Sequence, residues 1–351
     1  MSSYNTIAEN PNSTVVAEYV PDKKDATHYQ SENELEVEFI RLLETNGYAY
    51  LNITKDDDLL HNLRVQLSKL NEMEFSESEW QQMLTNYLTN KNEGIEEKTT
   101  KVQEDHIFNL KRDDGTTKNV RILDKDNIHN NFVQVINQYE TAKDSDAARK
   151  NRYDVTVLVN GLPMVHVELK RRGVAIREAF NQINRYQRDS FWADSGLFEY
   201  VQLFVISNGT HTKYYSNTTR SAHLREQQGR KSRKKTSNSF EFTCWWTDAQ
   251  NKRISDLVDF GKTFFSKHSL LSILTRYCVF TSDKLLLVMR PYQNVNKVDK
   301  NKDFVKTDKR LFDDVGLPKA DNGNYLWIQF SILLDAKPHE HFAKYMRVEA
   351  A

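Results

Sequence analysis

The sequence predicts an α/β fold in which a mixed central sheet is flanked by helices. Residues 152–169 form two runs rich in β-branched side chains around Asn160-Gly161, which is a strong hairpin signal. Residues 200–207 are apolar on both faces, as expected for a buried central strand. Helices are expected at residues 31–46 and 176–187, before and after the hairpin.

The first of these helices begins at Ser31. Glu34, three residues later, completes a capping box, and Gly47 ends the helix. Residues 1–30 are polar and are expected to form a partly extended lead-in, whereas residues 48–53 are expected to form a strand.

Several further elements are predicted between this helix and the hairpin. The apolar positions of the helices among them are expected to lie in the core rather than at a ligand site. The predicted elements are helices at 58–73 and 76–88, a charged connection at 91–101, a hairpin at 104–110 and 119–123 around Asp114-Gly115, a strand at 132–139 and a polar link at 141–150.

The register of the hairpin at residues 152–169 follows from its apolar pattern. A two-residue turn would put Asp154 and Glu168 on opposite faces of the sheet. A three-residue loop at 160–162 would instead pair Val155 with Val167 and set the two carboxylates side by side. Because a one-residue slip moves a whole apolar set to the wrong face, burial should select the second register. We therefore predict a three-residue loop or an equivalent bulge.

In that register Asp154 lies beside Glu168, and Lys170 lies one step along on the same face. Adjacent carboxylates repel unless a cation or a proton intervenes. Mg²⁺ takes one or two carboxylates together with substrate phosphate, and a lysine nearby can offset charge that develops on the phosphate. The alternative is an ordinary strand-start aspartate and a solvated Glu/Lys pair on an amphipathic strand.

The D…ExK pattern of Asp154, Glu168 and Lys170 resembles the PD-(D/E)xK nuclease signature. The segment YDVTVLVNGLPMVHVELKRRGVAIREAFNQINRYQRDSF, at 153–191, further resembles the R (restriction and motor) subunit of type I restriction-modification enzymes, HsdR. The wider resemblance covers residues 6–293. It implies a restriction-endonuclease-like fold in which the triad binds Mg²⁺ and cuts DNA. It also implies methylase (M) and specificity (S) subunits as partners, and ATP as a cofactor of the full-length family.

The same resemblance suggests further site residues. The family carries a glutamate on its first core helix near the metal, and Glu36 is the best match here, with Glu32 as the alternative. A solvated helix carboxylate is the competing interpretation for either. The family's Q-x-x-x-Y element is matched by Gln182 and Tyr186, which are four residues apart and so share a helix face. They would help to hold DNA or the site, or else form a buried polar pair that closes the helix onto the sheet.

Basic residues surround this segment. Arg171, Arg172 and Arg185 are the candidates for a local surface that contacts phosphates, with ordinary surface charge as the alternative. A second basic run, at residues 220–235, is expected to be a mobile loop, with DNA contact as the lesser alternative.

The remaining elements follow in order. They are an edge strand at 212–215, a packed aromatic segment at 240–246, helices at 254–265 and 270–277, and a short strand at 285–289. Gly261-Lys262-Thr263 imitates the end of a phosphate-binding loop, but the glycine expected five residues earlier is Asp256, so we reject that motif. Residues 290–293 resemble the opening of the family's motor, and no phosphate-binding loop follows them.

Composition limits the class of protein. The chain of 351 residues has 49 basic and 49 acidic side chains, so that any attraction for nucleic acid must come from local patches. Two cysteines without metal-type spacing suggest a reducing compartment, and no signal peptide or membrane-spanning segment is visible. We therefore expect a cytoplasmic protein.

These observations divide the chain into a lead-in at 1–30, a nuclease domain at 31–280, the start of a motor-like region at 281–293 and a divergent, truncated or rearranged tail at 294–351. The predicted function is Mg²⁺-dependent hydrolysis of DNA phosphodiesters within a restriction-modification complex, without a motor of its own. The alternatives are an unproductive remnant that docks on the methylase–specificity core or on DNA, and a stand-alone nuclease.

Overall fold

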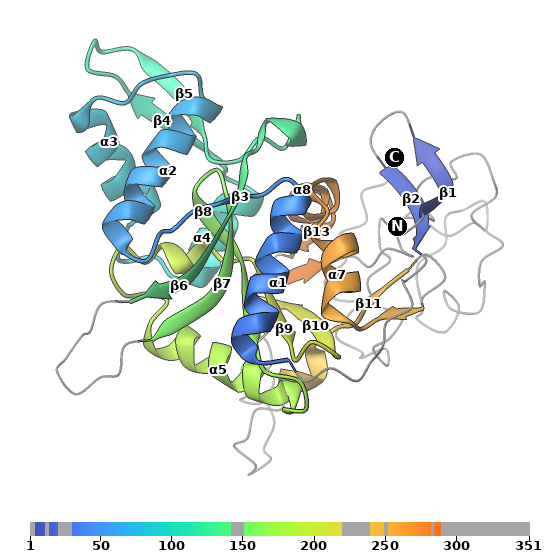
Figure 1. The fold of residues 1–351 in the computed structure, drawn as a ribbon. Coiled ribbons are helices and arrows are strands. Elements are labelled where there is room, and N and C mark those ends of the chain that lie inside the picture. Colours follow the sequence, from blue (N-terminus) through green and yellow to red (C-terminus); the bar gives the residue numbers. More distant parts are fainter. Residues whose placement is uncertain are drawn as a thin grey trace, which may run out of the picture.

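A six-stranded mixed sheet forms the centre of the computed structural model, which describes residues 4–10, 14–19, 30–141, 151–219, 239–248, 252–281 and 284–288 (Figure 1). In the strand order β10-β9-β8-β7-β6-β3, the pairs β8–β9 and β3–β6 are parallel and the others are antiparallel. The strands are β3 (Ala49–Tyr50), β6 (Val133–Glu140), β7 (Arg152–Val159), β8 (Leu162–Leu169), β9 (Leu203–Ser207) and β10 (Thr212–Ser216). This architecture confirms the predicted fold class.

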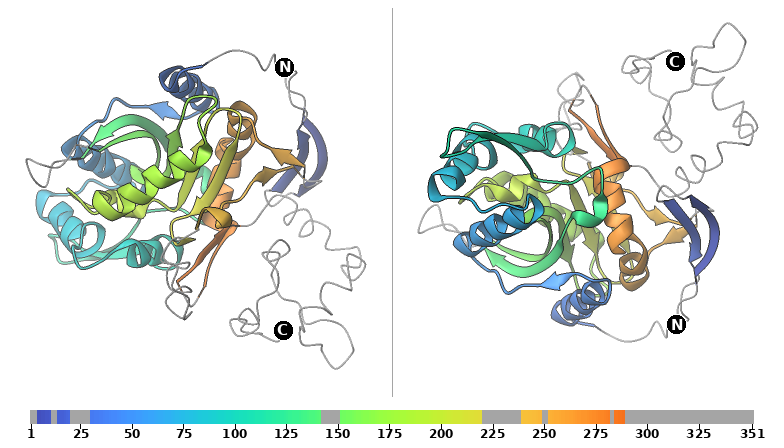
Figure 2. Two further views of the ribbon diagram at one scale, coloured as in Figure 1. Left: turned by 90° about the horizontal axis from the view of Figure 1, so that it is seen from below. Right: turned by 90° about the horizontal axis from the view of Figure 1, so that it is seen from above.

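Helices border the sheet. Helix α1 (Glu32–Thr45) contacts β7 and β8, whereas α5 (Ile176–Asp189) contacts β8 and β9 and lies across the sheet in the view from below (Figure 2). A further group of elements gathers at one end of the molecule in Figure 1. Its members are α2 (Asp56–Leu70), α3 (Glu77–Met83), a π-helical turn (Leu84–Leu88) and the hairpin of β4 (Ile107–Lys111) and β5 (Thr117–Arg121). Helix α4 (Ile95–Gln103) instead contacts the 3₁₀ turn at Leu197–Tyr200 and the strand β13 (Cys278–Phe280).

The predicted caps of α1 are present. The Ser31 hydroxyl accepts a hydrogen bond from the Glu34 amide at 3.2 Å, and the Glu34 carboxylate accepts one from the Ser31 amide at 2.8 Å. The helix is followed by Gly47 at a φ of 89°, a conformation that glycine adopts without strain. The local sequence therefore fixes both ends of the helix that borders the candidate site.

The prediction of a charged connection at 91–101 is wrong, because residues 95–103 form α4. Two of its lysines are buried, and each is paired with a half-buried glutamate. Lys98 donates to Glu199 and to the Gly196 carbonyl at 2.8 Å each, and Lys101 donates to Glu93. A helix that is charged in sequence is thus packed against the fold through ion pairs that local composition does not reveal.

Two predicted strands are shorter than expected. The strand expected at 48–53 is β3, which spans only Ala49–Tyr50, although the Leu51 amide still donates to the Val135 carbonyl at 2.9 Å. The strand expected at 200–207 begins at Leu203, because residues 197–200 form a 3₁₀ turn. The edge strand expected at 212–215 is confirmed as β10.

The turn between β7 and β8 is fixed by its two central residues. Asn160 and Gly161 have φ angles of 51° and 85°, as a two-residue hairpin turn of this hand requires. A Cβ on Gly161 would lie 2.6 Å from the Leu63 Cα, so that only glycine allows α2 to approach this closely. The Asn160 side chain accepts from the Phe132 amide and donates to Asn131, at 2.8 Å in both cases.

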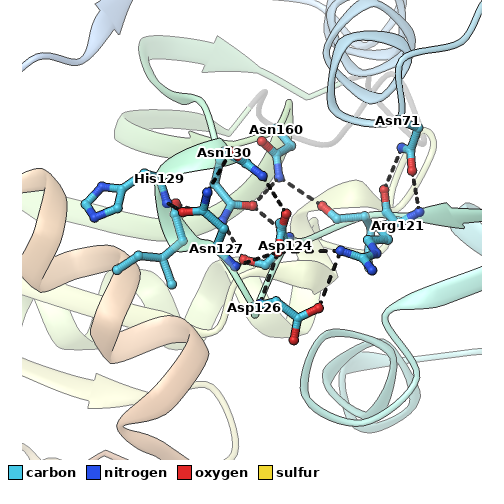
Figure 3. Close-up of polar contacts among 11 residues, drawn as sticks. Asn71, Arg121, Asp124, Asp126, Asn127, His129, Asn130 and Asn160 are labelled. Atoms are coloured by element: carbon cyan, nitrogen blue, oxygen red, sulfur yellow. Dashed lines mark hydrogen bonds and ion pairs between the residues drawn. The ribbon is translucent and has the colours of Figure 1, made fainter. Parts of the chain in front are cut away.

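A network around Asp124 continues from this turn (Figure 3). The Asp124 carboxylate accepts from the amides of Asp126 and Asn127 at 3.0 and 2.9 Å, and from the Asn130 side chain at 2.8 Å. Arg121 lies 3.6 Å away as an ion-pair partner. Burial raises the pKa of Asp124, but these donors outweigh it and hold that pKa below its ordinary value.

The C-terminal part of the described chain consists of short elements. They are β11 (Trp246–Thr247), β12 (Arg253–Ile254), α7 (Leu257–Phe264), α8 (Lys267–Arg276), β13 (Cys278–Phe280) and β14 (Leu286–Val288). Gly261 lies inside α7 against α1, which agrees with the rejection of a phosphate-binding loop. The expected helices and the last short strand are therefore confirmed.

At the N-terminus, β1 (Tyr4–Asn10) and β2 (Thr14–Tyr19) pair as an antiparallel hairpin within the expected lead-in. Most of the predicted polar link, the basic run at 220–235, the motor-like residues 290–293 and the tail at 294–351 lie outside the described residues. Within the described part, no helix combines the length and apolar character needed to cross a membrane.

Candidate active site

The hairpin of β7 and β8 brings the predicted acidic residues together. Val155 pairs with Val167, as the apolar pattern predicts, although the turn contains only Asn160 and Gly161. A register shift between Val157 and Leu158 compensates for the shorter turn. The equivalent bulge that we predicted as the alternative to a three-residue loop is therefore present. It restores the register in which Asp154 faces Glu168.

Asp154, Glu168 and Lys170 meet at the open end of this hairpin. The Leu169 amide donates to Asp154 Oδ2 at 2.9 Å, and the Lys170 ammonium donates to Glu168 Oε1 at 3.2 Å. Asp154 is 7% exposed and Glu168 is 0% exposed, so both carboxylates are removed from water. The structure thus assembles the triad that the sequence pattern predicted.

The triad combines two buried carboxylates with a single ammonium group. Burial raises the pKa of Asp154 well above its ordinary value, and the neighbouring Glu168 raises it further. Burial also raises the pKa of Glu168, to about 8, despite the opposing charge of Lys170. For Lys170 itself, burial lowers the pKa, but the surrounding carboxylates outweigh it and keep the ammonium charged. A further proton or cation would therefore stabilise this pair of carboxylates.

These residues fit a divalent cation of the Mg²⁺ type. Carboxylate oxygens are hard ligands, and Mg²⁺ usually takes one or two of them and fills its other positions with water and phosphate. In the described part of the chain, no set of three or more His, Cys, Asp or Glu side chains is arranged to hold a metal ion. Among the described residues, Asp154 and Glu168 are the paired carboxylates that could act as ligands of such an ion.

The sequence pattern did not single out His166, whose buried ring contacts Glu168. Its ring is 0% exposed, with Nε2 at 3.4 Å from Glu168 Oε2 and Nδ1 at 3.2 Å from the Thr156 hydroxyl. Burial lowers the pKa of His166 to about 4, so the ring is neutral at physiological pH. The sequence could have indicated this contact, because residues two apart on a strand lie on the same face and His166 precedes Glu168 by two residues.

The two candidate glutamates of α1 are placed differently. Both oxygens of Glu36 accept hydrogen bonds, one from Asn137 and one from Gln138. Gln138 has a φ of 54° at an irregularity in β6, where both consecutive side chains reach Glu36. Glu32, the alternative match, lies 3.1 Å from the Lys170 ammonium. Glu32 is thus the glutamate in direct contact with the triad, and a metal-binding role for Glu36 stays a prediction.

The pair Gln182 and Tyr186 holds α5 against the sheet. Gln182 donates to the Tyr186 hydroxyl, which donates in turn to the Arg152 carbonyl at 2.9 Å, two residues before Asp154. Tyr186 is buried beside His166. These contacts support the structural alternative, in which a buried polar pair closes the helix onto the sheet. Any contact of either residue with DNA stays a prediction.

The three candidate arginines also differ. Arg172 is engaged by Gln30 and Thr210 at 3.2 Å each, and its ion pair with Asp256 spans 3.8 Å. Arg185 is exposed, with its guanidinium 5.6 Å from the Tyr186 ring centre. Arg171 is exposed as well. The structure therefore brings Arg172 into the fold and leaves Arg171 and Arg185 open to a ligand.

Comparison with known proteins gives consistent matches. Residues 29–223 match the family described as "Type I restriction enzyme R protein N terminus". The chain is 45% identical, over 314 residues, to the type I restriction enzyme EcoprrI endonuclease subunit of Escherichia coli. That match covers 87% of this chain and 95% of the relative.

Two more distant relatives extend these matches. The type I restriction enzyme SsaAORF53P endonuclease subunit of Staphylococcus saprophyticus is 38% identical over 271 residues, which are 76% of this chain and 26% of the relative. A putative type I restriction enzyme endonuclease subunit of Methanocaldococcus jannaschii is 32% identical over 105 residues, which are 29% of this chain and 10% of the relative. The chain thus spans about a quarter of the staphylococcal relative.

Proposed function

This chain belongs to the family of type I restriction enzyme R proteins, and on that premise we propose that it is a Mg²⁺-dependent DNA endonuclease acting within a restriction-modification complex. The observation that carries the proposal is the meeting of Asp154, Glu168 and Lys170 at the open end of one hairpin. Two buried carboxylates beside an ammonium form an arrangement suited to a metal ion and a phosphate.

Each residue of the triad has a separate task in the proposed reaction. Asp154 and Glu168 would hold Mg²⁺, which supplies a bound water of lowered pKa and polarises the phosphate. The Leu169 amide fixes Asp154 through Oδ2, and Lys170 fixes Glu168 through Oε1. The Lys170 ammonium stays charged between Glu168 and Glu32, so that it would orient a water or offset charge on the phosphate.

The substrate and the partners follow from the family. The staphylococcal relative is named an endonuclease subunit, and a subunit implies an assembly. We propose that the substrate is DNA and that the partners are the methylase (M) and specificity (S) subunits. We assign cleavage rather than ATP-driven movement to this chain, because its sequence has no complete phosphate-binding loop. We place the reaction in the cytoplasm, in accordance with two cysteines that show no metal-type spacing.

A plasmid-nicking assay with Mg²⁺ tests the proposed function. Asp154→Asn keeps the size of the side chain and removes its charge, and we expect nicking to fall about a hundredfold to a thousandfold. Asp126→Asn is the matched control, because the Asp126 carboxylate is 86% exposed and lies in the network around Asp124. Nicking that persists in Asp154→Asn would show that the site is wrongly assigned. DNA binding by the wild type without nicking would favour the docking remnant.

A further inference from the structure

A polar ring lies inside a cluster of aromatic side chains beneath α5. The ring of His166 is 0% exposed, and its centre lies 5.5 to 6.5 Å from the ring centres of Tyr153, Tyr186, Phe191 and Phe204. All four contacts are edge-to-face, with interplanar angles of 66° to 80°. Because rings enclose it on several sides, the imidazole is held in one orientation.

Both nitrogens of the His166 ring have polar partners. Nδ1 lies 3.2 Å from the hydroxyl of Thr156, which is the residue paired with His166 on β7. Nε2 lies 3.4 Å from Glu168 Oε2. Lys170 contacts the other oxygen of the same carboxylate, Oε1, at 3.2 Å. The two oxygens of Glu168 are therefore contacted by different groups, one at the strand end and one within the core.

The structural explanation for His166 is a core histidine that only packs among these rings. Its polar atoms argue against packing alone, because a buried imidazole costs free energy unless its nitrogens are hydrogen-bonded. A phenylalanine would pack in this cluster without that cost, as Phe191 and Phe204 do. What the histidine adds is a pair of directed nitrogen atoms, and one of them meets a proposed metal ligand.

The direction of this hydrogen bond follows from the chemistry of the partners. Burial lowers the pKa of His166 to about 4, so the neutral ring has one N–H and one acceptor nitrogen. A carboxylate that binds a metal ion only accepts, whereas the Thr156 hydroxyl can donate. Nε2 therefore donates to Glu168, and Nδ1 accepts from Thr156. A ring that donated to the Val155 carbonyl instead, which is also within its reach, would leave Glu168 without this donor.

We propose that His166 is a positioning residue of the metal site, whose Nε2–H holds Oε2 of Glu168 while Thr156 fixes the ring from its other nitrogen. The inference rests on the proposed function and adds to it a residue that touches neither the ion nor the substrate. With Oε2 held by His166 and Oε1 by Lys170, the carboxylate keeps one orientation, and less ordering is needed when the ion binds. At 3.4 Å the contact is long for a hydrogen bond, and such contacts often tighten when a ligand binds.

Two amide variants separate this hydrogen bond from packing. In His166→Gln the amide nitrogen is as many bonds from the backbone as Nε2, so it still reaches Glu168. In His166→Asn the amide ends at the depth of Nδ1 and does not reach Glu168. Both variants bury an amide in place of the ring, so they share the cost of a buried polar group. Phe204→Leu is the control for packing, because the apolar Phe204 ring lies against His166.

Mg²⁺ binding to the full chain is measured by isothermal titration calorimetry, together with the melting temperature of each metal-free variant. We expect His166→Asn to weaken Mg²⁺ binding about tenfold and to raise the Mg²⁺ concentration for half-maximal plasmid nicking by the same factor. His166→Gln should bind Mg²⁺ within about twofold of the wild type. Phe204→Leu should lower the melting temperature and leave the Mg²⁺ affinity unchanged.

The tautomer of the ring gives a second readout, which does not depend on the stability of a variant. NMR of isotope-labelled histidine distinguishes a ring protonated at Nε2 from one protonated at Nδ1, and the His166 signals are those missing from His166→Gln. We expect His166 of the wild type in Mg²⁺ to carry its proton on Nε2. A proton on Nδ1 would overturn the inference, because Nε2 could not then donate to Glu168.

Equal Mg²⁺ affinity in the wild type and His166→Asn would overturn the inference and leave the proposed nuclease untouched. Equal losses in His166→Asn and His166→Gln would also overturn it, since a donor toward Glu168 would then make no difference. So would a similar loss in Phe204→Leu, which would indicate a general loosening of the cluster. Wild-type protein that neither binds Mg²⁺ nor nicks plasmid would contradict the proposed function, and the inference would fail with it.

Discussion

The two ends of the β7–β8 hairpin are equally buried but differ in how their polar groups are satisfied. At the turn, Asn160 and Asp124 have hydrogen-bond partners on several sides. At the open end, Asp154 and Glu168 lie side by side with fewer donors and with the charge of Lys170. The pKa of Asp124 is below its ordinary value despite burial, whereas burial raises that of Glu168 to about 8.

This difference separates a structural carboxylate from a candidate catalytic one. Donors around a buried carboxylate stabilise its charged form, so the turn end contributes to stability. A buried pair of carboxylates without enough donors lowers the stability of the fold until a cation binds. The open end is therefore destabilising without a ligand and suited to binding one. Variants at either end should therefore change stability in opposite directions.

The largest effect is expected at the turn. Gly161→Ala adds a methyl group at positive φ that would lie 2.6 Å from the Leu63 Cα, so that α2 or the turn must move. We expect the free energy of unfolding to fall by about 3 kcal/mol or more, as measured by urea denaturation. Gly115→Ala is the control, since Gly115 has the same φ of 85° with nothing within 4 Å of the added methyl group. Equal losses in both variants would show that φ strain alone is responsible.

Removal of the Asp124 carboxylate should have the next largest effect. Asp124→Ala leaves the amides of Asp126 and Asn127 and the Asn130 side chain without their acceptor. We expect a loss of about 2–3 kcal/mol in the free energy of unfolding at neutral pH. The loss should shrink as the pH falls below 3.8 and through the lowered pKa of Asp124 in the folded protein, because protonation of Asp124 in the wild type removes the same interactions. A loss that does not depend on pH would contradict the proposed role of its charge.

At the open end, Glu168→Gln should stabilise the protein when no metal ion is present. The folded-state pKa of Glu168 is raised from 4.5 to about 8, so the unfolded chain releases its proton first and wild-type stability falls as the pH rises through this interval. We expect the variant to gain about 1–2 kcal/mol at pH 8 and little at pH 4.5, as measured by urea denaturation.

In the presence of Mg²⁺, the wild type should be more stable than Glu168→Gln, which is the reverse of the order expected without a metal ion. Ligand binding to the folded state raises the melting temperature of the wild type, whereas Glu168→Gln lacks one of the proposed ligands. A melting temperature that rises equally with Mg²⁺ in both proteins would place the ion elsewhere.

The smallest effect is expected for Tyr186→Phe. This change removes the hydroxyl that donates to the Arg152 carbonyl and accepts from Gln182. We expect a loss of about 1 kcal/mol in the free energy of unfolding. Tyr153→Phe is a matched control, because its hydroxyl contacts a Ser190 side chain that also reaches the Tyr186 carbonyl. A loss of stability in Tyr153→Phe that exceeds the loss in Tyr186→Phe would indicate that the hydrogen bond to the Arg152 carbonyl is not the main contribution of this group of hydroxyls to stability.

Much of the candidate site could be predicted from the sequence, because strand alternation and turn chemistry are local. The apolar sets around Asn160-Gly161 fix the register, and the register places Asp154, Glu168 and Lys170 together. The resemblance supplied a choice of two helix glutamates, but the distance from Lys170 to Glu32 depends on how α1 packs. The burial of Lys98 and Lys101 in α4 likewise depends on partners that are distant or unremarkable in sequence.

The sequence by itself determined the hairpin register, and with it the meeting of Asp154, Glu168 and Lys170, because strand alternation and turn chemistry act between residues close in the chain. The tertiary structure alone decided how deeply the carboxylates are buried and that the buried His166 ring contacts Glu168. Burial and strand order are set by segments far apart in sequence, and desolvation shifts the pKa of a carboxylate only after those segments have packed.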